Sequence, residues 1–143
     1  MEESIFDELP FYHIIWNFEN EAEFKHLAQL SDLLASRSYA TISLLTITYL
    51  PYGRQDKEIN NENTFALRTF CKLLNQLGFS RIFIEDPHSD VAMRLIDNSS
   101  AIYFKNRIRD CYNTVKADMV CYPDEGALVK YSKLLFFSIH LWE

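Results

Sequence analysis

The sequence predicts an α/β fold, a parallel sheet of about four strands flanked by helices. Short apolar runs alternate with segments of helical periodicity, which is the pattern of βαβ units. Three of the predicted strands end at prolines, Pro51, Pro87 and Pro123, which are 36 residues apart (87 − 51 and 123 − 87). This spacing accommodates one strand, one helix and the return to the next strand, so right-handed crossovers between parallel strands are expected.

The first predicted unit is a strand over residues 11–18 followed by a helix over residues 20–37. The strand is a short apolar and aromatic run, FYHIIWNF. In the helix, apolar residues recur at three- and four-residue steps from Phe24 to Leu34, which predicts one apolar face. Asn20 and Glu23 are typical of a helix start, because a cap side chain and a returning carboxylate satisfy free backbone N–H groups.

The later units follow the same order. Residues 40–50 (ATISLLTITYL) are rich in β-branched residues, which favours a central parallel strand covered on both faces. A helix over residues 64–77 ends at Gly78, and a third strand covers residues 81–86. A short helix over residues 90–96, a less regular stretch to residue 116, a fourth strand over residues 117–122 and a helix from about Gly126 complete the chain.

Length and composition indicate one globular domain over residues 1–143. Apolar residues make up 48% of the 143 residues, enough for a packed core. The formal net charge of −6 argues against a nucleic-acid-binding surface, and no segment approaches the ~18 apolar residues that a membrane span needs. Three widely spaced cysteines without a CxxC pattern predict a reduced, cytoplasmic protein. Cys71 on an apolar helix face and Cys121 in a strand are expected to be buried thiols.

Polar clusters follow three of the predicted strands. Because the carboxyl ends of parallel strands lie along one edge of a sheet, where α/β sheets bind ligands, these clusters are expected to converge on one site. Arginine offers a planar fork of donors to phosphate, and carboxylate and imidazole groups can organise Mg²⁺ directly or through its waters. The candidate residues are Arg54, Gln55 and Asp56 after the second strand, Asp86 and His88 after the third, and Asp124 after the fourth.

Simpler interpretations stand beside this one. Residues 54–56 taken alone read as a solvated loop, His88 could cap the next helix, and Asp124 could only cap the helix near Gly126. No Walker loop, GxGxxG, GxSxG or zinc-type Cys/His set occurs, so those functional classes are excluded.

Three segments resemble motifs of the ribose-phosphate pyrophosphokinase family, in order and at family-like spacing. LPYGRQD at residues 50–56 resembles the family's ATP-contacting segment. DPHS at residues 86–89 resembles its Asp-Leu-His-Ser/Ala segment, and YPDEGA at residues 122–127 resembles its Ser-Pro-Asp-x-Gly-Gly segment. The resemblance covers residues 11–133, within the family's N-terminal domain, and phage-encoded members are the branch to compare first.

The resemblance implies an ATP-dependent transferase of nucleotide biosynthesis. It implies that Arg54, Gln55 and Asp56 hold ATP and that Asp86, His88 and Asp124 serve Mg²⁺. The family moves the β,γ-diphosphoryl group of ATP to the 1-hydroxyl of ribose 5-phosphate, giving phosphoribosyl pyrophosphate and AMP. Family members are oligomers, so a homo-oligomer or an association with a full-length synthase is implied as well.

The sequence also departs from the family pattern. It resembles the family over only part of the family's length, apparently truncated at both ends. The early loop that lends ATP contacts across subunits, the mobile catalytic loop and the ribose 5-phosphate loop have no counterpart here. Pro87 and Ala127 replace the usual Leu and Gly of their motifs. We therefore assign no catalytic residue and expect the chain alone to be inactive. The alternatives are a regulatory or assembly subunit, or a remnant that binds Mg-ATP without catalysis.

Overall fold

The computed structural model describes residues 11–36, 42–57, 65–116, 118–132 and 139–141. Residues 37, 40, 41, 64 and 117, which fall within predicted elements, lie outside the described residues. The chain divides into two compact units, residues 1–103 and 104–143, and each is described by itself.

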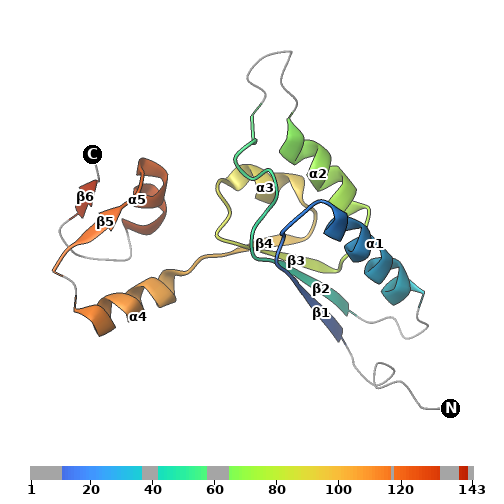
Figure 1. Cartoon of the computed structure of the whole chain (residues 1–143), viewed down its shortest axis with the longest axis horizontal. Coiled ribbons are helices and arrows are strands. Elements are labelled where there is room, and N and C mark those ends of the chain that lie inside the picture. Colours follow the sequence, from blue (N-terminus) through green and yellow to red (C-terminus); the bar gives the residue numbers. More distant parts are fainter. Residues whose placement is uncertain (1–10, 37–41, 58–64, 117, 133–138, 142–143) are drawn as a thin grey trace. The chain divides into compact units, whose positions relative to one another are not determined.

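The first unit is a four-stranded parallel sheet with three helices (Figure 1). Its strands are β1 (Phe11–Trp16), β2 (Ile42–Ile47), β3 (Arg81–Glu85) and β4 (Ser99–Ile102), in the spatial order β1-β2-β3-β4. The connecting helices are α1 (Ala22–Ala35), α2 (Ala66–Asn75) and α3 (Asp90–Leu95). The predicted α/β class and the parallel four-stranded sheet are therefore confirmed.

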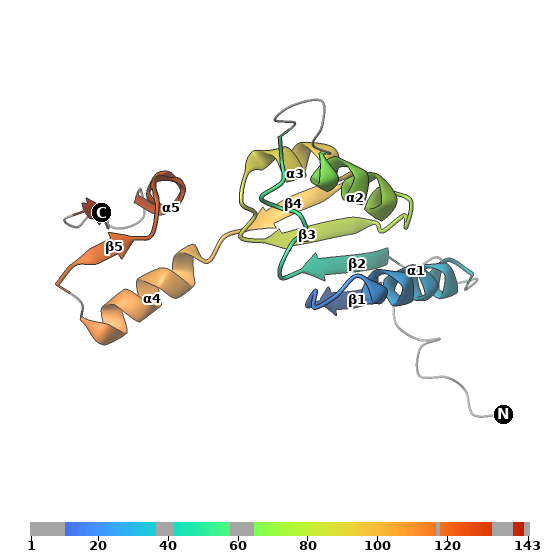
Figure 2. The ribbon, with the colours of Figure 1, turned by 45° about the horizontal axis from the view of Figure 1, so that its top comes forward.

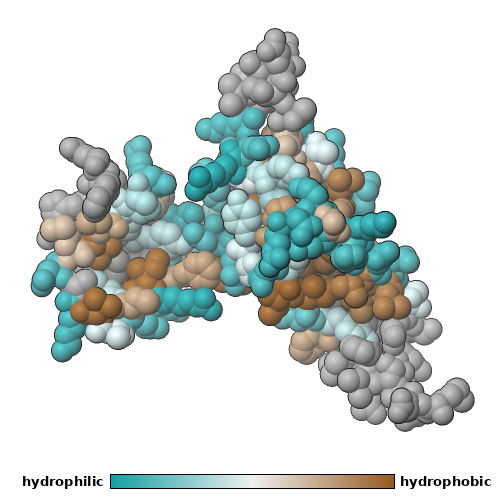
Figure 3. All heavy atoms as spheres, viewed as in Figure 1, coloured by the Kyte–Doolittle hydropathy of each residue, from teal (hydrophilic) through white to brown (hydrophobic). Residues whose placement is uncertain are grey.

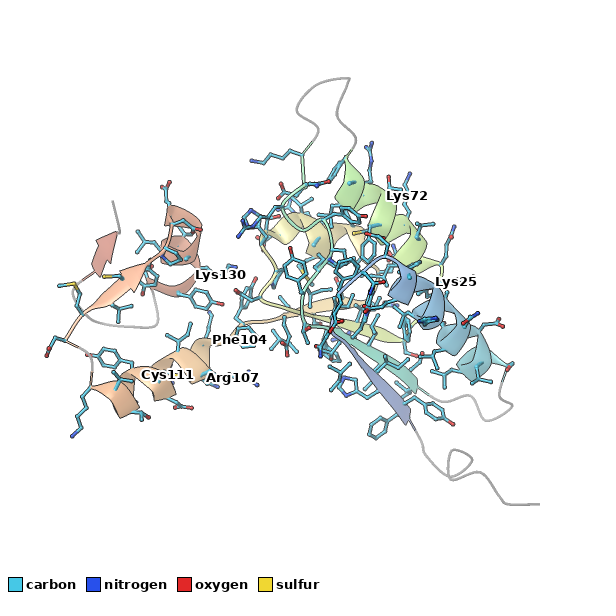
Figure 4. The ribbon with its side chains drawn as sticks, viewed as in Figure 1. Lys25, Lys72, Phe104, Arg107, Cys111 and Lys130 are labelled. Atoms are coloured by element: carbon cyan, nitrogen blue, oxygen red, sulfur yellow. The ribbon has the colours of Figure 1, made fainter. Side chains whose placement is uncertain are left out.

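The three helices lie on the same face of this sheet (Figure 2). Each strand pairs with the next one in sequence, and right-handed crossovers that always advance in one direction place every helix on one side. Strand residues on this face form the core with residues of the helices. The buried members include Trp16, Leu45, Ile47, Ile82 and Ile84 from the strands and Leu27, Leu67, Phe70 and Leu74 from the helices. The outward sides of α1 and α2 carry charges such as Lys25 and Lys72 (Figure 4).

The opposite face, which we call the open face, carries apolar side chains that the three helices do not cover. Phe11, Ile15 and Ile42 are 51%, 63% and 56% exposed. In the view of Figure 3, hydrophobic residues form a band across the first unit that covers the region of β1, β2 and α1. On this face His13 Nε2 lies 2.8 Å from Thr46 Oγ1, and Thr46 is buried. The expectation that the second strand is covered on both faces holds for the carboxyl half of β2, whereas its first residue is exposed.

The second unit contains α4 (Lys105–Val115), β5 (Val120–Tyr122), α5 (Glu125–Tyr131) and β6 (Ile139–Leu141). Strands β5 and β6 pair in parallel as a separate two-stranded sheet. In α4, the Arg107 guanidinium lies 5.2 Å from the centre of the Phe104 ring, and both residues are marked in Figure 4.

The fourth strand of the large sheet was wrongly predicted. It is β4, within the stretch expected to be irregular, and not the segment at residues 117–122, of which only Val120–Tyr122 forms a strand, β5, in the separate sheet. The sequence of β4 is SSAI, which lacks an apolar run, and backbone pairing with β3 rather than side-chain pattern stabilises it. Helix α4 in the same stretch was also missed, because it buries no residue and its apolar positions are sparse.

The start of α1 differs slightly from the prediction. The helix begins at Ala22, yet Asn20 and Glu23 still bond the free amides near its start. The Asn20 side chain accepts from the Ala22 amide at 3.0 Å, and the Glu23 carboxylate accepts from the Glu19 amide at 3.0 Å.

Candidate nucleotide site at the carboxyl ends of β2 and β3

The turn after β2 presents Arg54 and Gln55 to solvent. The Gly53 amide donates to the Leu50 carbonyl at 3.2 Å, and the Gln55 amide donates to the Tyr52 carbonyl at 2.8 Å. A Cβ atom at Gly53 would lie 3.2 Å from the Leu50 carbonyl oxygen, a closer approach than side chains normally make. Glycine therefore permits this tight turn, which leaves both polar side chains exposed at the carboxyl end of the strand.

The loop after β3 begins with a residue in the left-handed region. Asp86 has φ 43°, and its amide donates to the Ile102 carbonyl of β4 at 2.8 Å. Asp86 is partly buried, Pro87 is buried, and His88 is exposed. Ser89, not His88, caps α3, because its hydroxyl accepts from the Val91 amide. The capping interpretation of His88 is thus excluded, and its imidazole stands free of that structural role.

A hydrogen bond joins the two loops. The Ser89 hydroxyl donates to Asp56 Oδ2 at 2.5 Å. A Cβ atom at Gly53 would lie 4.0 Å from the His88 Cβ, so the turn after β2 and the loop after β3 are in contact. The structure therefore brings together two of the three predicted polar clusters, with five of the six candidate residues.

The sixth candidate, Asp124, belongs to the second unit. Its carboxylate accepts from the Ala127 amide at 2.7 Å and caps α5, as the simpler interpretation expected. Two expectations for Asp124 stay predictions: that its cluster joins the other two, and that its carboxylate binds a metal.

Tyr103, which the sequence did not single out, lies near Asp86, one of the predicted metal residues. Burial raises the pKa of the Tyr103 phenol above its ordinary value, and the carboxylates of Asp90 and Asp86 raise it further. Tyr103 directly follows β4, so a correct prediction of that strand would have placed it at the same sheet edge.

The described residues offer a sparse set of metal ligands. Among residues 11–36, 42–57, 65–116, 118–132 and 139–141, no three His, Cys, Asp or Glu side chains are grouped closely enough to hold a metal. Mg²⁺ usually keeps several waters and takes one or two protein carboxylates together with substrate phosphates. The partly buried Asp86 beside the exposed His88 fits such a cation, bound mainly through a polyphosphate.

Sequence comparison relates the chain to one enzyme class. No protein-family profile matches it. A ribose-phosphate pyrophosphokinase of Saccharolobus solfataricus is 21% identical over 90 residues, which cover 62% of this chain and 31% of that protein.

Structural comparison finds the same fold in a solved protein. The crystal structure of a phosphoribosylpyrophosphate synthetase from Mycobacterium smegmatis aligns with a TM-score of 0.71 and 20% identity, over 90% of this chain and 46% of that one. The chain shares the fold of this synthetase. It spans less than half the length of either relative.

The described part of the chain contains no helix of the length and apolar character that crossing a membrane requires.

Two cysteine expectations have different outcomes: Cys71 is buried as expected, whereas Cys121 is exposed.

Proposed function

We propose that this chain is the nucleotide-handling part of a ribose-phosphate pyrophosphokinase N-terminal domain. The observation that carries the proposal is the Ser89–Asp56 hydrogen bond, since it joins the segments that resemble the family's ATP and metal motifs at the carboxyl edge of a parallel sheet. The names of the two relatives support the same class.

In this proposal each candidate residue has a separate task. The Arg54 guanidinium donates paired hydrogen bonds to ATP phosphate oxygens, and Gln55 binds the base or sugar. Asp56, fixed by Ser89, contributes to the ATP contacts. Asp86 and His88 bind Mg²⁺ directly or through its waters, and the metal role that the resemblance implies for Asp124 stays a separate prediction. When bound, Mg²⁺ neutralises charge on the β- and γ-phosphates.

The reaction proposed for the complete enzyme is transfer of the β,γ-diphosphoryl group of ATP to the 1-hydroxyl of ribose 5-phosphate. Phosphoryl transfer needs little covalent help from protein, so this chain's residues would act by holding ATP in line with that hydroxyl. The catalytic and ribose 5-phosphate loops lie outside the resemblance. We therefore propose that this chain binds Mg-ATP and does not complete the diphosphoryl transfer by itself.

The test combines binding with turnover. Calorimetry should show Mg-ATP binding that Arg54→Ala abolishes and Arg94→Ala leaves unchanged. Arg94 is the matched control because it is an exposed arginine in the last turn of α3. AMP release from Mg-ATP should not exceed that of the Arg54→Ala chain, with or without ribose 5-phosphate. Absence of Mg-ATP binding would contradict the proposal, and ribose-dependent AMP release would show a complete active site instead.

The open face favours a second candidate, a non-catalytic subunit that associates with other chains. Besides its exposed apolar residues, this face carries Arg81 at the amino end of β3 and Glu85 at its carboxyl end. Two copies packed face to face about a two-fold axis, with their β3 strands antiparallel, would place Arg81 of each opposite Glu85 of the other. We therefore propose a second copy as the partner.

Sedimentation velocity over a range of concentrations tests this association. The chain should form dimers, and Ile15→Lys should return it to a monomer. Lys25→Ala, on the outward side of α1, is the control that should leave dimerisation unchanged. A monomer at every concentration would exclude self-association, and a complex formed only with a full-length synthase would identify an assembly subunit.

A further inference from the structure

Tyr52 links the candidate nucleotide turn to the start of α1. Its hydroxyl donates a hydrogen bond to the Glu21 carboxylate, which lies 31 residues earlier in the chain. Glu21 is the residue that directly precedes α1. The bond therefore ties the turn after β2 to the loop after β1, both at the carboxyl edge of the sheet.

The backbone of Tyr52 is held in an unfavourable conformation. Its φ of 59° lies in the left-handed region, which a residue with a bulky side chain rarely adopts unless its surroundings impose it. The Tyr52 ring packs against Phe70, with ring centres 5.9 Å apart, and Phe70 in turn contacts Trp16 and Phe24. Ring packing and the hydroxyl bond thus hold this residue at two separate points.

The conformation of Tyr52 sets the direction of the residues that follow it. The Tyr52 carbonyl accepts from the Gln55 amide at 2.8 Å, and Arg54 lies within the loop that this bond closes. A rotation of the backbone at Tyr52 would break that bond and redirect both Arg54 and Gln55. The Ser89–Asp56 bond restrains the far end of the same segment.

We propose that Tyr52 and Glu21 are positioning residues that hold the turn at residues 51–54 so that Arg54 and Gln55 are preorganised for a nucleotide polyphosphate. This inference rests on the proposed function. Preorganisation raises affinity because the free chain does not have to order the turn when the ligand binds.

A role in core packing alone would need the Tyr52 ring and not its hydroxyl. Tyr52→Phe separates the two, since it keeps the ring on Phe70 and removes only the bond to Glu21. Tyr49→Phe is the matched control, because Tyr49 lies three residues earlier and is 62% exposed. Glu21→Gln keeps a hydrogen-bond acceptor, whereas Glu21→Ala removes it.

Amide hydrogen exchange measured by NMR tests the turn without ligand. In Tyr52→Phe and Glu21→Ala the Gln55 amide should exchange about tenfold faster, the effect of losing one hydrogen bond to a charged group. Tyr49→Phe should leave the exchange rate unchanged, and Glu21→Gln, which keeps an uncharged acceptor, should exchange at a rate between those of Glu21→Ala and the unaltered chain. Equal exchange rates in Tyr52→Phe and the unaltered chain would overturn the proposal.

Mg-ATP affinity measured on the same proteins tests the consequence. Tyr52→Phe and Glu21→Ala should each weaken binding by about threefold to tenfold, and the double variant should be no weaker than either single one. The affinity of Glu21→Gln should lie between that of Glu21→Ala and that of the unaltered chain. If the unaltered chain binds Mg-ATP and Tyr52→Phe binds it equally well, the positioning role is overturned while the proposed function stands. If the unaltered chain binds no Mg-ATP, the proposed function fails, and the nucleotide role of Tyr52 fails with it.

Discussion

The Ser89 hydroxyl donates a hydrogen bond to the Asp56 carboxylate, and it accepts one from the Val91 amide at the start of α3. One side chain thus caps a helix and joins two loops that lie 33 residues apart in sequence. The position of Asp56 at the candidate site therefore depends on the same serine that begins α3.

Ser89→Ala should destabilise the chain and disturb the site together. Loss of the cap and of a hydrogen bond to a carboxylate should lower the free energy of unfolding by about 1–3 kcal/mol. Urea unfolding measures this loss, and calorimetry should show weaker Mg-ATP binding. Ser36→Ala is the control, because the Ser36 hydroxyl donates to the nearby Leu33 carbonyl in an exposed position. Equal stability of the Ser89→Ala and Ser36→Ala chains would contradict the coupling.

Asp86→Asn should weaken cation-dependent nucleotide binding without unfolding the protein. Asparagine tolerates the left-handed conformation of Asp86 and retains its size, so the main change is the loss of the negative charge. We expect Mg-ATP affinity to fall about tenfold, equivalent to ~1.4 kcal/mol. Mn²⁺ binding followed by electron paramagnetic resonance should weaken in parallel. Asp97→Asn, an exposed aspartate after α3, should change neither quantity.

The environment of Trp16 should respond to acid through Glu23. The Glu19 amide is the largest cause that lowers the pKa of the Glu23 carboxyl below its ordinary value of 4.5, and the Trp16 indole N–H also lowers it. A carboxyl with a lowered folded pKa stabilises the fold above its unfolded value, and this contribution is lost as the pH falls through the folded pKa.

Fluorescence titration checks this prediction. The emission of Trp16 should change below pH 4.5, as protonation of Glu23 weakens the 3.1 Å bond from the indole to its carboxylate. In a Trp142→Phe background Trp16 is the single tryptophan, so the difference between that chain and its Glu23→Gln variant isolates Glu23. An identical acid transition in both proteins would show that Glu23 is not its source.

The three cysteines should differ sharply in reactivity towards a thiol reagent. Burial raises the pKa of the Cys71 thiol to about 11, so it stays protonated and inaccessible near neutral pH. Cys111 and Cys121 are exposed. Under native conditions the reagent should modify these two promptly, and Cys71 should react only when denaturant unfolds the chain. Prompt reaction of a Cys71-only variant, with serine at the other two positions, would refute its burial.

Local features of the sequence predicted much of this fold. The strands β1, β2 and β3 could be predicted from their own residues, because burial in a parallel sheet requires nearly continuous apolar residues. Pro51 and Pro87 mark the ends of two of them. Because parallel strands end along one edge of the sheet, their direction alone placed five candidate residues together: Arg54, Gln55, Asp56, Asp86 and His88. The sequence failed at β4, since SSAI has no pattern that distinguishes a strand from a loop.

The residue pairs that organise the site were decided by tertiary structure. Ser89 with Asp56 and Tyr52 with Glu21 are 33 and 31 residues apart, and each partner alone looks like an ordinary loop residue. The assignment of the fourth strand was likewise non-local, because pairing with β3 uses backbone groups that every residue carries. Side-chain pattern along the chain specifies which segments are buried, whereas the partner of each polar group depends on which segments the packed sheet brings together.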